Sequence, residues 1–380
     1  MRHRPRLVLL PIAVALALAT AQGVLAEGGA PAAATSGAVF VQTNQPTGNQ
    51  IVVYDRGSDG RLTRSAAYAT GGNGGTALPG TESDHLASQG SLAYDGSRQV
   101  LIAVNAGSNT VSTFRVHGDR LELANVVGSG GQFPASVAVH GSLVYVLNSG
   151  GAGSVQGFRL GGGGLQPIPG SGRTLGLSNT SPPNFLSSPG QVGFSPDGGK
   201  LIVTTKASGS AIDVFGVGAG GLLTATPTVN ASATPVPFAF TFKPTGELVA
   251  GEAGASSVTT YTLTSGGTLA NPQSQTDGQT ALCWIQRIGD FYYVSNTGSN
   301  TLSAFRIGAD ARPTLVSTTG VVATTEPGPI DLTNPAGTGF LYGETGGGTI
   351  DEYSANHDGS LTKLGVIGEL PAGLEGIASS

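Results

Sequence analysis

The stretch Ala103-Val-Asn-Ala-Gly-Ser-Asn-Thr-Val-Ser-Thr-Phe114 and its near copy Val294-Ser-Asn-Thr-Gly-Ser-Asn-Thr-Leu-Ser-Ala-Phe305 decide the fold class. Each begins with a β-rich run, passes through an Asn/Gly/Ser turn, and ends in a second β-rich run that an aromatic residue closes. This pattern is typical of a β-hairpin. Because the two copies lie far apart in the chain, they indicate that one hairpin unit is repeated.

The closing aromatic of the hairpin marks the number of repeats. It recurs at intervals of 44 to 60 residues, at Tyr54, Phe114, Phe158, Phe215, Tyr261, Phe305 and Tyr353. Most hairpins follow another short apolar run, such as 136–139 or 191–194, and each is followed by a turn and a leucine. Four short strands in about 45 residues make a propeller blade. The sequence therefore predicts an all-β, seven-bladed β-propeller with four-stranded blades.

The two ends of the repeat region predict how the ring closes. The first unit begins at Gly37 with its second strand, and so lacks an inner strand. The segment 374–378 near the other end has the pattern of an inner strand with no hairpin after it. We expect this C-terminal strand to join the first blade, which would protect the sheet edges. One domain, 37–380, follows, with very little helix.

Residues 1–26 have the pattern of a signal peptide. Arg2, Arg4 and Arg6 precede a short apolar run, and Val24-Leu25-Ala26 fits the small-x-small cleavage pattern. Residues 27–36 are rich in Ala, Gly, Pro and Ser, and we expect a disordered leader there. The protein is therefore predicted to be secreted.

The charge balance argues against several classes of partner. Cleavage after Ala26 would remove three arginines and no acid, which changes the net charge from −5 to −8. Without a basic cluster, neither nucleic acid nor an anionic membrane surface is an expected partner. No later segment is long and apolar enough for membrane insertion. Cys283 is the sole cysteine, so no internal disulfide is expected.

Other motifs are missing as well. We find no Gly-x-Ser-x-Gly elbow and no His or Cys pair at metal-ligand spacing, so no metal and no cofactor are expected. A closed ring leaves no free sheet edge, which favours a monomer.

One face of the propeller should carry the functional residues. Two connections, 69–91 and 170–188, are longer than the others, and both join the outer strand of one blade to the inner strand of the next. Long loops on a rigid scaffold often carry function. The same face should present the hairpin-turn residues, Asn105, Asn148, Lys206, Glu252, Asn296 and Glu344.

The hairpins resemble YVTN-type propeller repeats. Together with Phe194-Ser-Pro-Asp-Gly198 and Asp358-Gly-Ser-Leu361, they are similar to the seven-bladed lactonase family. That family includes 6-phosphogluconolactonase-like proteins and carboxymuconate cyclase-like enzymes. The resemblance implies a propeller that acts on a lactone or its hydroxy acid. A His-x-His type segment of the family corresponds here to Ser188-Pro-Gly190-Gln191, which contains no histidine.

The candidate site residues follow from the predicted face. Lys206 could neutralise a substrate carboxylate or an oxyanion, and Glu252 could act as a general base, so these two are the candidate catalytic residues. The candidate substrate-binding residues are Glu344, Asn148, Asn296, Trp284 and His85, which follows Asp84 in the first long loop.

Each candidate also has a structural interpretation. The two glutamates could be solvated turn acids, and Lys206 could be a surface lysine. The asparagines suit left-handed turn positions. Trp284, next to Cys283, could simply pack in the core.

Two hypotheses about function remain. The first is a secreted enzyme that hydrolyses or forms a small lactone of an acidic compound at the channel mouth. The second is a non-catalytic exterior propeller that binds a protein, a sugar or a small ligand on its loop-rich face, at the cell envelope for example. Convergence of Lys206, Glu252 and Trp284 on one closed pocket would favour the enzyme.

Overall fold

The computed structural model describes Met1 and residues 35–79 and 83–380. The predicted signal peptide, 1–26, apart from Met1, and the predicted leader up to residue 34 lie outside the described residues. The described residues from Thr35 onward form one compact unit. Its first strand begins at Thr35, two residues before the predicted domain start.

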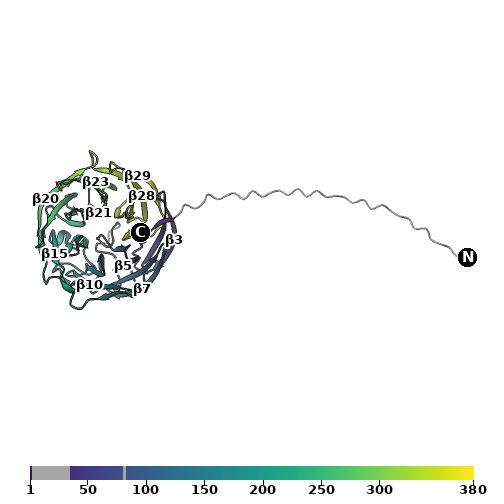
Figure 1. Ribbon diagram of the computed structural model, residues 1–380, viewed down its shortest axis with the longest axis horizontal. Helices are drawn as coiled ribbons and strands as arrows, with labels where there is room; N and C mark the ends of the chain where they lie inside the picture. The colour runs from purple at the N-terminus through teal and green to yellow at the C-terminus, as the bar shows by residue number, and fades with distance from the viewer. Residues whose placement is uncertain (2–34, 80–82) are drawn as a thin grey trace. The chain divides into compact units, whose positions relative to one another are not determined.

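The described chain is a ring of seven sheets, as Figure 1 shows. The first four blades consist of β1 (Thr35–Gln42), β2 (Gln50–Gly57), β3 (Leu62–Ala69) and β30 (Ile377–Ser379); β4 (Leu92–Asp95), β5 (Val100–Asn105), β6 (Thr110–His117) and β7 (Arg120–Gly128); β8 (Pro134–His140), β9 (Leu143–Asn148), β10 (Ser154–Gly161), β11 (Gly164–Pro167) and the short β12 (Arg173–Thr174); and β13 (Gln191–Phe194), β14 (Lys200–Thr204), β15 (Ala211–Gly216) and β16 (Thr228–Ala231). The last three consist of β17 (Pro237–Phe242), β18 (Leu248–Glu252), β19 (Ser257–Leu263) and β20 (Leu269–Thr276); β21 (Leu282–Ile288), β22 (Phe291–Asn296), β23 (Thr301–Ile307), β24 (Pro313–Leu315) and β25 (Val321–Thr324); and β26 (Pro329–Thr333), β27 (Phe340–Thr345), β28 (Thr349–Ala355) and β29 (Leu361–Ile367). The predicted fold class is confirmed.

The C-terminal strand closes the ring. β30 pairs antiparallel with β1, with Phe40 opposite Ala378, and so supplies the innermost strand of the first blade. The predicted closure is therefore confirmed. Since β1 is bonded on both sides, neither of its edges is left to template aggregation.

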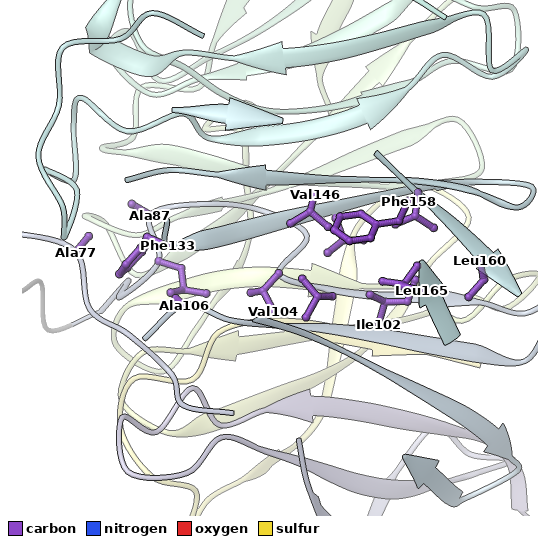
Figure 2. Packing of buried hydrophobic residues seen from close by; sticks show 14 residues of the cluster. Ala77, Ala87, Ile102, Val104, Ala106, Phe133, Val146, Phe158, Leu160 and Leu165 are labelled. Atoms are coloured by element: carbon purple, nitrogen blue, oxygen red, sulfur yellow. The ribbon is translucent and has the colours of Figure 1, made fainter. Parts of the chain in front are cut away.

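Apolar side chains between neighbouring blades form the core. All seven closing aromatics are at most 2% exposed. Figure 2 shows the cluster between the second and third blades, with Leu160 and Leu165 at one end of a row and Ala77, Ala87 and Phe133 at the other. This row reaches from the outer strands to the first long loop, so packing between blades also anchors that loop.

Helix content is very low, as predicted. In the described part of the chain the helices are two single 3₁₀ turns, η1 (Lys206–Ser208) and η2 (Ala219–Gly221). Neither is long enough to cross a membrane, and the described residues contain no other helix.

Candidate active site

The two long loops meet on one face of the ring. The backbone N–H of Phe185 donates to the carbonyl of Leu78 at 2.8 Å, and the N–H of Leu78 donates to the carbonyl of Pro183 at 2.7 Å. This contact brings together segments that are more than 100 residues apart in the sequence. The loops therefore form one assembly above the channel.

Residues 84–89 of the first loop, which we call the channel segment, are tied to several blades. The indole N–H of Trp284 donates to the carbonyl of Ser88 at 3.1 Å, and the Ser88 hydroxyl donates to the carbonyl of Ala135 at 2.8 Å. The side-chain amide of Gln89 makes two hydrogen bonds of 3.0 Å to the backbone of Ile285. Because Ala135 and Trp284 belong to the third and sixth blades, the segment spans the channel.

A cavity of about 440 Å³ opens between the channel segment and the second long loop. This volume suits a small organic ligand. Most of the lining is apolar, with Lys206 and Asp84 as its charged groups. The lining residues are Ser83, Asp84, Phe185, Leu186, Lys206, Val236, Phe238, Ala253, Gly254, Ala281, Cys283, Trp284, Thr297 and Gly298.

Lys206 is completely buried, yet it lines this cavity. Its Nζ donates to the carbonyl of Ala87 at 2.6 Å and lies 4.9 Å and 5.0 Å from the ring centroids of Phe185 and Phe238. Attraction between the ammonium and the ring faces stabilises the charge in this apolar setting. Only one of the three N–H donors of the ammonium is used by Ala87, so it can also bind a ligand.

Asp84 lies opposite, on the channel segment, and is 2% exposed. Its Oδ1 accepts the N–H of Ala87 at 2.6 Å, and its carboxylate attracts the Lys206 ammonium. Glu375, which accepts the N–H groups of His85 and Leu86, also donates a carboxyl hydrogen bond to Asp84. One cation thus faces an acid that is itself held in place by a second acid.

Burial shifts the pKa values of Asp84 and Lys206 toward neutral pH. Burial raises the pKa of Asp84 to about 6, although the Lys206 charge acts in the opposite direction. Burial lowers the pKa of Lys206 to about 8, against the attraction of Asp84. The pKa of Glu375 is raised well above its ordinary value by burial and by the Asp84 charge. A carboxylate and an ammonium therefore coexist in a narrow range around neutrality.

Two of the predicted site residues, Lys206 and Trp284, come together here. The Trp284 ring lies 4.9 Å from Phe238, at an interplanar angle of 58°, and lines the same wall as Lys206. The indole N–H donates to the carbonyl of Ser88, so the part of the ring that lines the cavity offers an apolar surface.

Glu252, the predicted general base, is outside the residues that line the cavity. Its carboxylate is fully buried and accepts hydrogen bonds from five hydroxyl groups, those of Ser232, Thr234, Ser257, Thr259 and Tyr261. These groups hold the side chain between the fourth and fifth blades. Glu252 therefore stabilises the packing of these two blades and does not contact the cavity that Lys206 and Asp84 line.

Three of the four remaining polar hairpin residues, Asn148, Asn296 and Glu344, are also buried away from the cavity. The amide of Asn296 donates to Thr301 and Ser303, at 3.2 and 2.8 Å, and Asn148 donates to the carbonyl of Ser129 at 3.2 Å. Glu344 accepts the N–H of Gly376 at 2.5 Å. None of the three lines the cavity.

The asparagines differ from expectation in their backbone as well. Asn296 is the last residue of β22, and the left-handed conformation belongs instead to Asn300, with φ of 56°. Asn109, the matching residue of the other hairpin copy, has the same φ of 56°. In each hairpin it is therefore the second asparagine that makes the turn, whereas the first binds hydroxyl groups.

His85 is half-buried beside the cavity but does not line it. Burial lowers the pKa of its imidazole, which keeps the ring neutral at neutral pH. Its backbone N–H, rather than its ring, serves the site by binding Glu375. Its neighbour Asp84 is the group that enters the cavity.

Sequence reasoning missed several parts of the site. Phe185 and Phe238 flank the lysine, and Glu375 binds Asp84, but they come from a loop, an inner strand and the closing segment respectively. An aromatic residue inside a long, polar loop, as at Phe185, was the one signal available. In the described residues no group of three or more His, Cys, Asp or Glu side chains is arranged to hold a metal ion.

Comparison with solved structures places this fold among the 6-phosphogluconolactonase-like seven-bladed propellers. A protein from Lactobacillus plantarum is 19% identical with a TM-score of 0.71, covering 91% of this chain and 99% of its own. A proposed 6-phosphogluconolactonase from Bacteroides uniformis is 17% identical with a TM-score of 0.68, covering 90% and 99%. The periplasmic gluconolactonase PpgL of Pseudomonas aeruginosa is 16% identical with a TM-score of 0.69, covering 90% and 98%.

At these identities the likeness establishes the fold, and the chemistry must be argued from the site. No protein-family model and no curated protein matches the sequence.

Proposed function

We propose that this protein binds and hydrolyses a small lactone or ester with a hydrocarbon body in the 440 Å³ cavity. The observation that carries the proposal is the pairing of Lys206 and Asp84 inside an otherwise apolar lining. An apolar cavity with a few convergent polar groups and shifted pKa values is typical of an active site.

The two side chains suit the two needs of the reaction. The Lys206 ammonium would donate to the carbonyl oxygen and stabilise the oxyanion that forms. Asp84, as a carboxylate, would take a proton from the attacking water, whose oxygen bonds to the carbonyl carbon. When the ring C–O bond breaks, the same proton passes from Asp84 to the leaving oxygen. The product is a hydroxy acid.

The lining argues for an apolar substrate instead of the acidic one expected from sequence. Among the described residues that line the cavity, Lys206 is the one cation, and Asp84 opposes its charge. A phosphate or a second carboxylate would need further Lys or Arg contacts. Phe185, Phe238 and Trp284 instead provide apolar surface for a ring or an alkyl chain.

Burial of the polar pair favours one alternative, a binding protein without turnover. Lys206 has no exposed surface and holds Ala87, so its charge could serve only to fix the channel segment. In that case the cavity would bind an apolar ligand and leave it unchanged. Turnover separates the two functions.

The deciding experiment is hydrolysis of δ-decalactone and glucono-δ-lactone by the purified domain, followed with a pH indicator. We expect the alkyl lactone to react faster, and Lys206→Met and Asp84→Asn to lower kcat/KM at least about 100-fold. Asp213→Asn is a matched control, since Asp213 is also a buried acid of raised pKa but does not line the cavity.

A cavity variant covers the case in which the polar variants do not fold. Ala253→Leu narrows the cavity and leaves both charged groups in place, so it should raise KM for the alkyl lactone. Tight binding of δ-decalactone with no turnover would establish the binding protein. If δ-decalactone is neither bound nor hydrolysed, the proposed site is wrong.

We also propose that the protein is exported, because residues 1–26 have the charge and apolar pattern of a signal peptide.

A further inference from the structure

A second cavity, of about 550 Å³, lies at the other end of the channel. Its lining includes Gly96, Asn334 and Ala336, from turns between the first and second strands of their blades. The first cavity instead contains Lys206, Ala253 and Gly298, which follow the second strands. Because consecutive strands run in opposite directions, these two sets of turns lie at opposite ends of the ring.

The channel segment and the residue after it separate the two cavities. Asp84 lines the first cavity, whereas Gln89 and Gly90 line the second. The two bonds between Gln89 and Ile285 hold this partition against the sixth blade. A ligand in the second cavity therefore has no direct contact with the proposed catalytic pair.

Asp331 is the charged side chain of this second cavity. Its Oδ1 accepts the N–H of Leu332 at 2.9 Å, its Oδ2 accepts the N–H of Gly90 at 3.5 Å, and the residue is 4% exposed. Among the described residues, no Lys, Arg or His lines the cavity. The charged groups that act on Asp331 from its surroundings are Asp84 and Glu344, both acids. An ionised Asp331 therefore lacks a counter-charge.

The rest of the lining can complete a site for a cation. The side-chain nitrogen of Gln286 donates to the carbonyl of Arg287. Its side-chain carbonyl oxygen accepts no hydrogen bond within the described residues. Tyr94 adds an aromatic ring, and Leu92 and Ala93 add apolar surface. Oxygen acceptors beside an aromatic ring are a usual setting for an organic ammonium group.

We propose that this second cavity binds a small organic cation, an alkylammonium compound, whose ammonium group lies against Asp331. The volume is too large for a bare ion and fits a molecule with a short hydrocarbon part. Asp331 provides the opposite charge, and the Gln286 carbonyl oxygen a further acceptor.

Binding of such a cation is linked to a proton. Burial, together with the negative charge of Asp84, raises the pKa of Asp331 to about 7, against the hydrogen bonds from Leu332, Gly90 and Ile377. A bound ammonium favours the carboxylate, so it displaces the proton of Asp331 when the pH is below this value. Affinity should therefore increase between pH 5.5 and pH 8.

Calorimetric titration of the purified domain with n-butylammonium chloride tests the proposal, with 1-pentanol as the neutral probe of similar size. We expect the ammonium to bind at least about tenfold more tightly at pH 8 than at pH 5.5, and Asp331→Asn to abolish that difference. Asp213→Asn, a buried acid away from this cavity, should leave binding unchanged.

A measurement on the unaltered protein keeps the test independent of variant folding. Titrations at pH 6.5 in two buffers of different ionisation enthalpy should reveal release of a proton on binding. If butylammonium binds no better than pentanol, or binds without releasing a proton, the proposal is wrong. Lactone hydrolysis plays no part in either readout.

Discussion

Asp84 and Lys206 bind the two backbone polar groups of a single residue, Ala87. The carboxylate accepts its N–H and the ammonium donates to its carbonyl, each at 2.6 Å. Ala87 has a positive φ of 58°, which few alanines adopt, and it is completely buried. These two oppositely charged side chains therefore hold an unfavourable backbone conformation at the centre of the channel segment.

Loss of the lysine should destabilise the protein strongly. Lys206→Met leaves the Ala87 carbonyl unbonded and Asp84 without its cation, so we expect the free energy of unfolding to fall by about 3 kcal/mol. Urea denaturation measures this. In the double variant with Asp84→Asn the additional loss should be small, because no unpaired charge remains. Lys200→Met, at a half-buried lysine that does not line the cavity, is the matched control. An equal loss there would contradict the prediction.

Lactone hydrolysis should have a bell-shaped pH profile. As the pH falls below about 6, Asp84 becomes protonated and can no longer accept a proton from water. As the pH rises above about 8, Lys206 loses the charge that stabilises the oxyanion. Measurement of kcat/KM from pH 4.5 to pH 10 checks both limbs. Rates that stay constant down to pH 4.5 would exclude Asp84 as the base.

Stability should decrease as the pH rises from 5 to 8. The folded-state pKa of Asp331, about 7, lies above its ordinary value of 3.8, so between these values the folded state binds more protons than the unfolded state. Folding therefore becomes less favourable as the pH rises through this interval, by on the order of 4 kcal/mol in total. Glu344 and Glu375 act in the same direction.

Thermal unfolding across this pH range measures the effect, with the highest Tm expected at the acidic end. Asp331→Asn should raise Tm at both ends of this range, and by more at pH 8 than at pH 5, because the penalty from Asp331 grows with pH up to about 7. A Tm that rises between pH 5 and pH 8 would show that other groups dominate.

Replacement of Glu252 should lower the stability of the fold and leave ligand binding unchanged. In the wild type the surrounding hydroxyls donate to the Glu252 carboxylate, and in Glu252→Gln some of them would face the N–H₂ group, which cannot accept a hydrogen bond. We therefore expect the free energy of unfolding to fall by about 2 kcal/mol, with KM for lactones unchanged. Glu122→Gln, at a largely exposed acid, provides the comparison and should cost little. A large rise in KM for Glu252→Gln would assign Glu252 to the site.

The exported protein should begin at Glu27. Intact-mass measurement of the protein recovered outside the cells that make it should show loss of residues 1–26. Replacement of Leu9 and Leu10 by Arg interrupts the apolar run and should keep the protein inside the cell. Recovery of the full chain outside the cell would contradict cleavage at this site.

The blades were predictable because their signal is local and repeated. The turn residues and the closing aromatics lie within each hairpin, and the segment 374–378, an inner-strand pattern with no hairpin after it, indicated ring closure. Side-chain direction at the hairpin position was not predictable. β18 extends to Glu252, which then faces the hydroxyls of the adjacent strand, whereas β14 ends at Thr204 and Lys206 turns away with φ of 48°. Residues equivalent in the repeat thus point to different places.

The cavity was beyond sequence reasoning for a related reason. Its walls come from two loops that pair with each other and from Phe238 and Trp284 on inner strands. Nothing in the first loop indicates that Asp84, and not the adjacent His85, enters the channel. That choice depends on contacts with Trp284 and Glu375, which the fold alone brings together.

Ring closure also controls when the site can form. Glu375 precedes β30 by two residues, so the segment that completes the first blade also delivers the acid that holds Asp84. During synthesis these residues emerge after all seven hairpins. Until they arrive, the channel segment lacks its anchor and the polar pair has no fixed geometry. A chain interrupted before residue 375 would therefore lack both the strand that closes the ring and the acid that binds Asp84, so the proposed site can form only when the fold is complete.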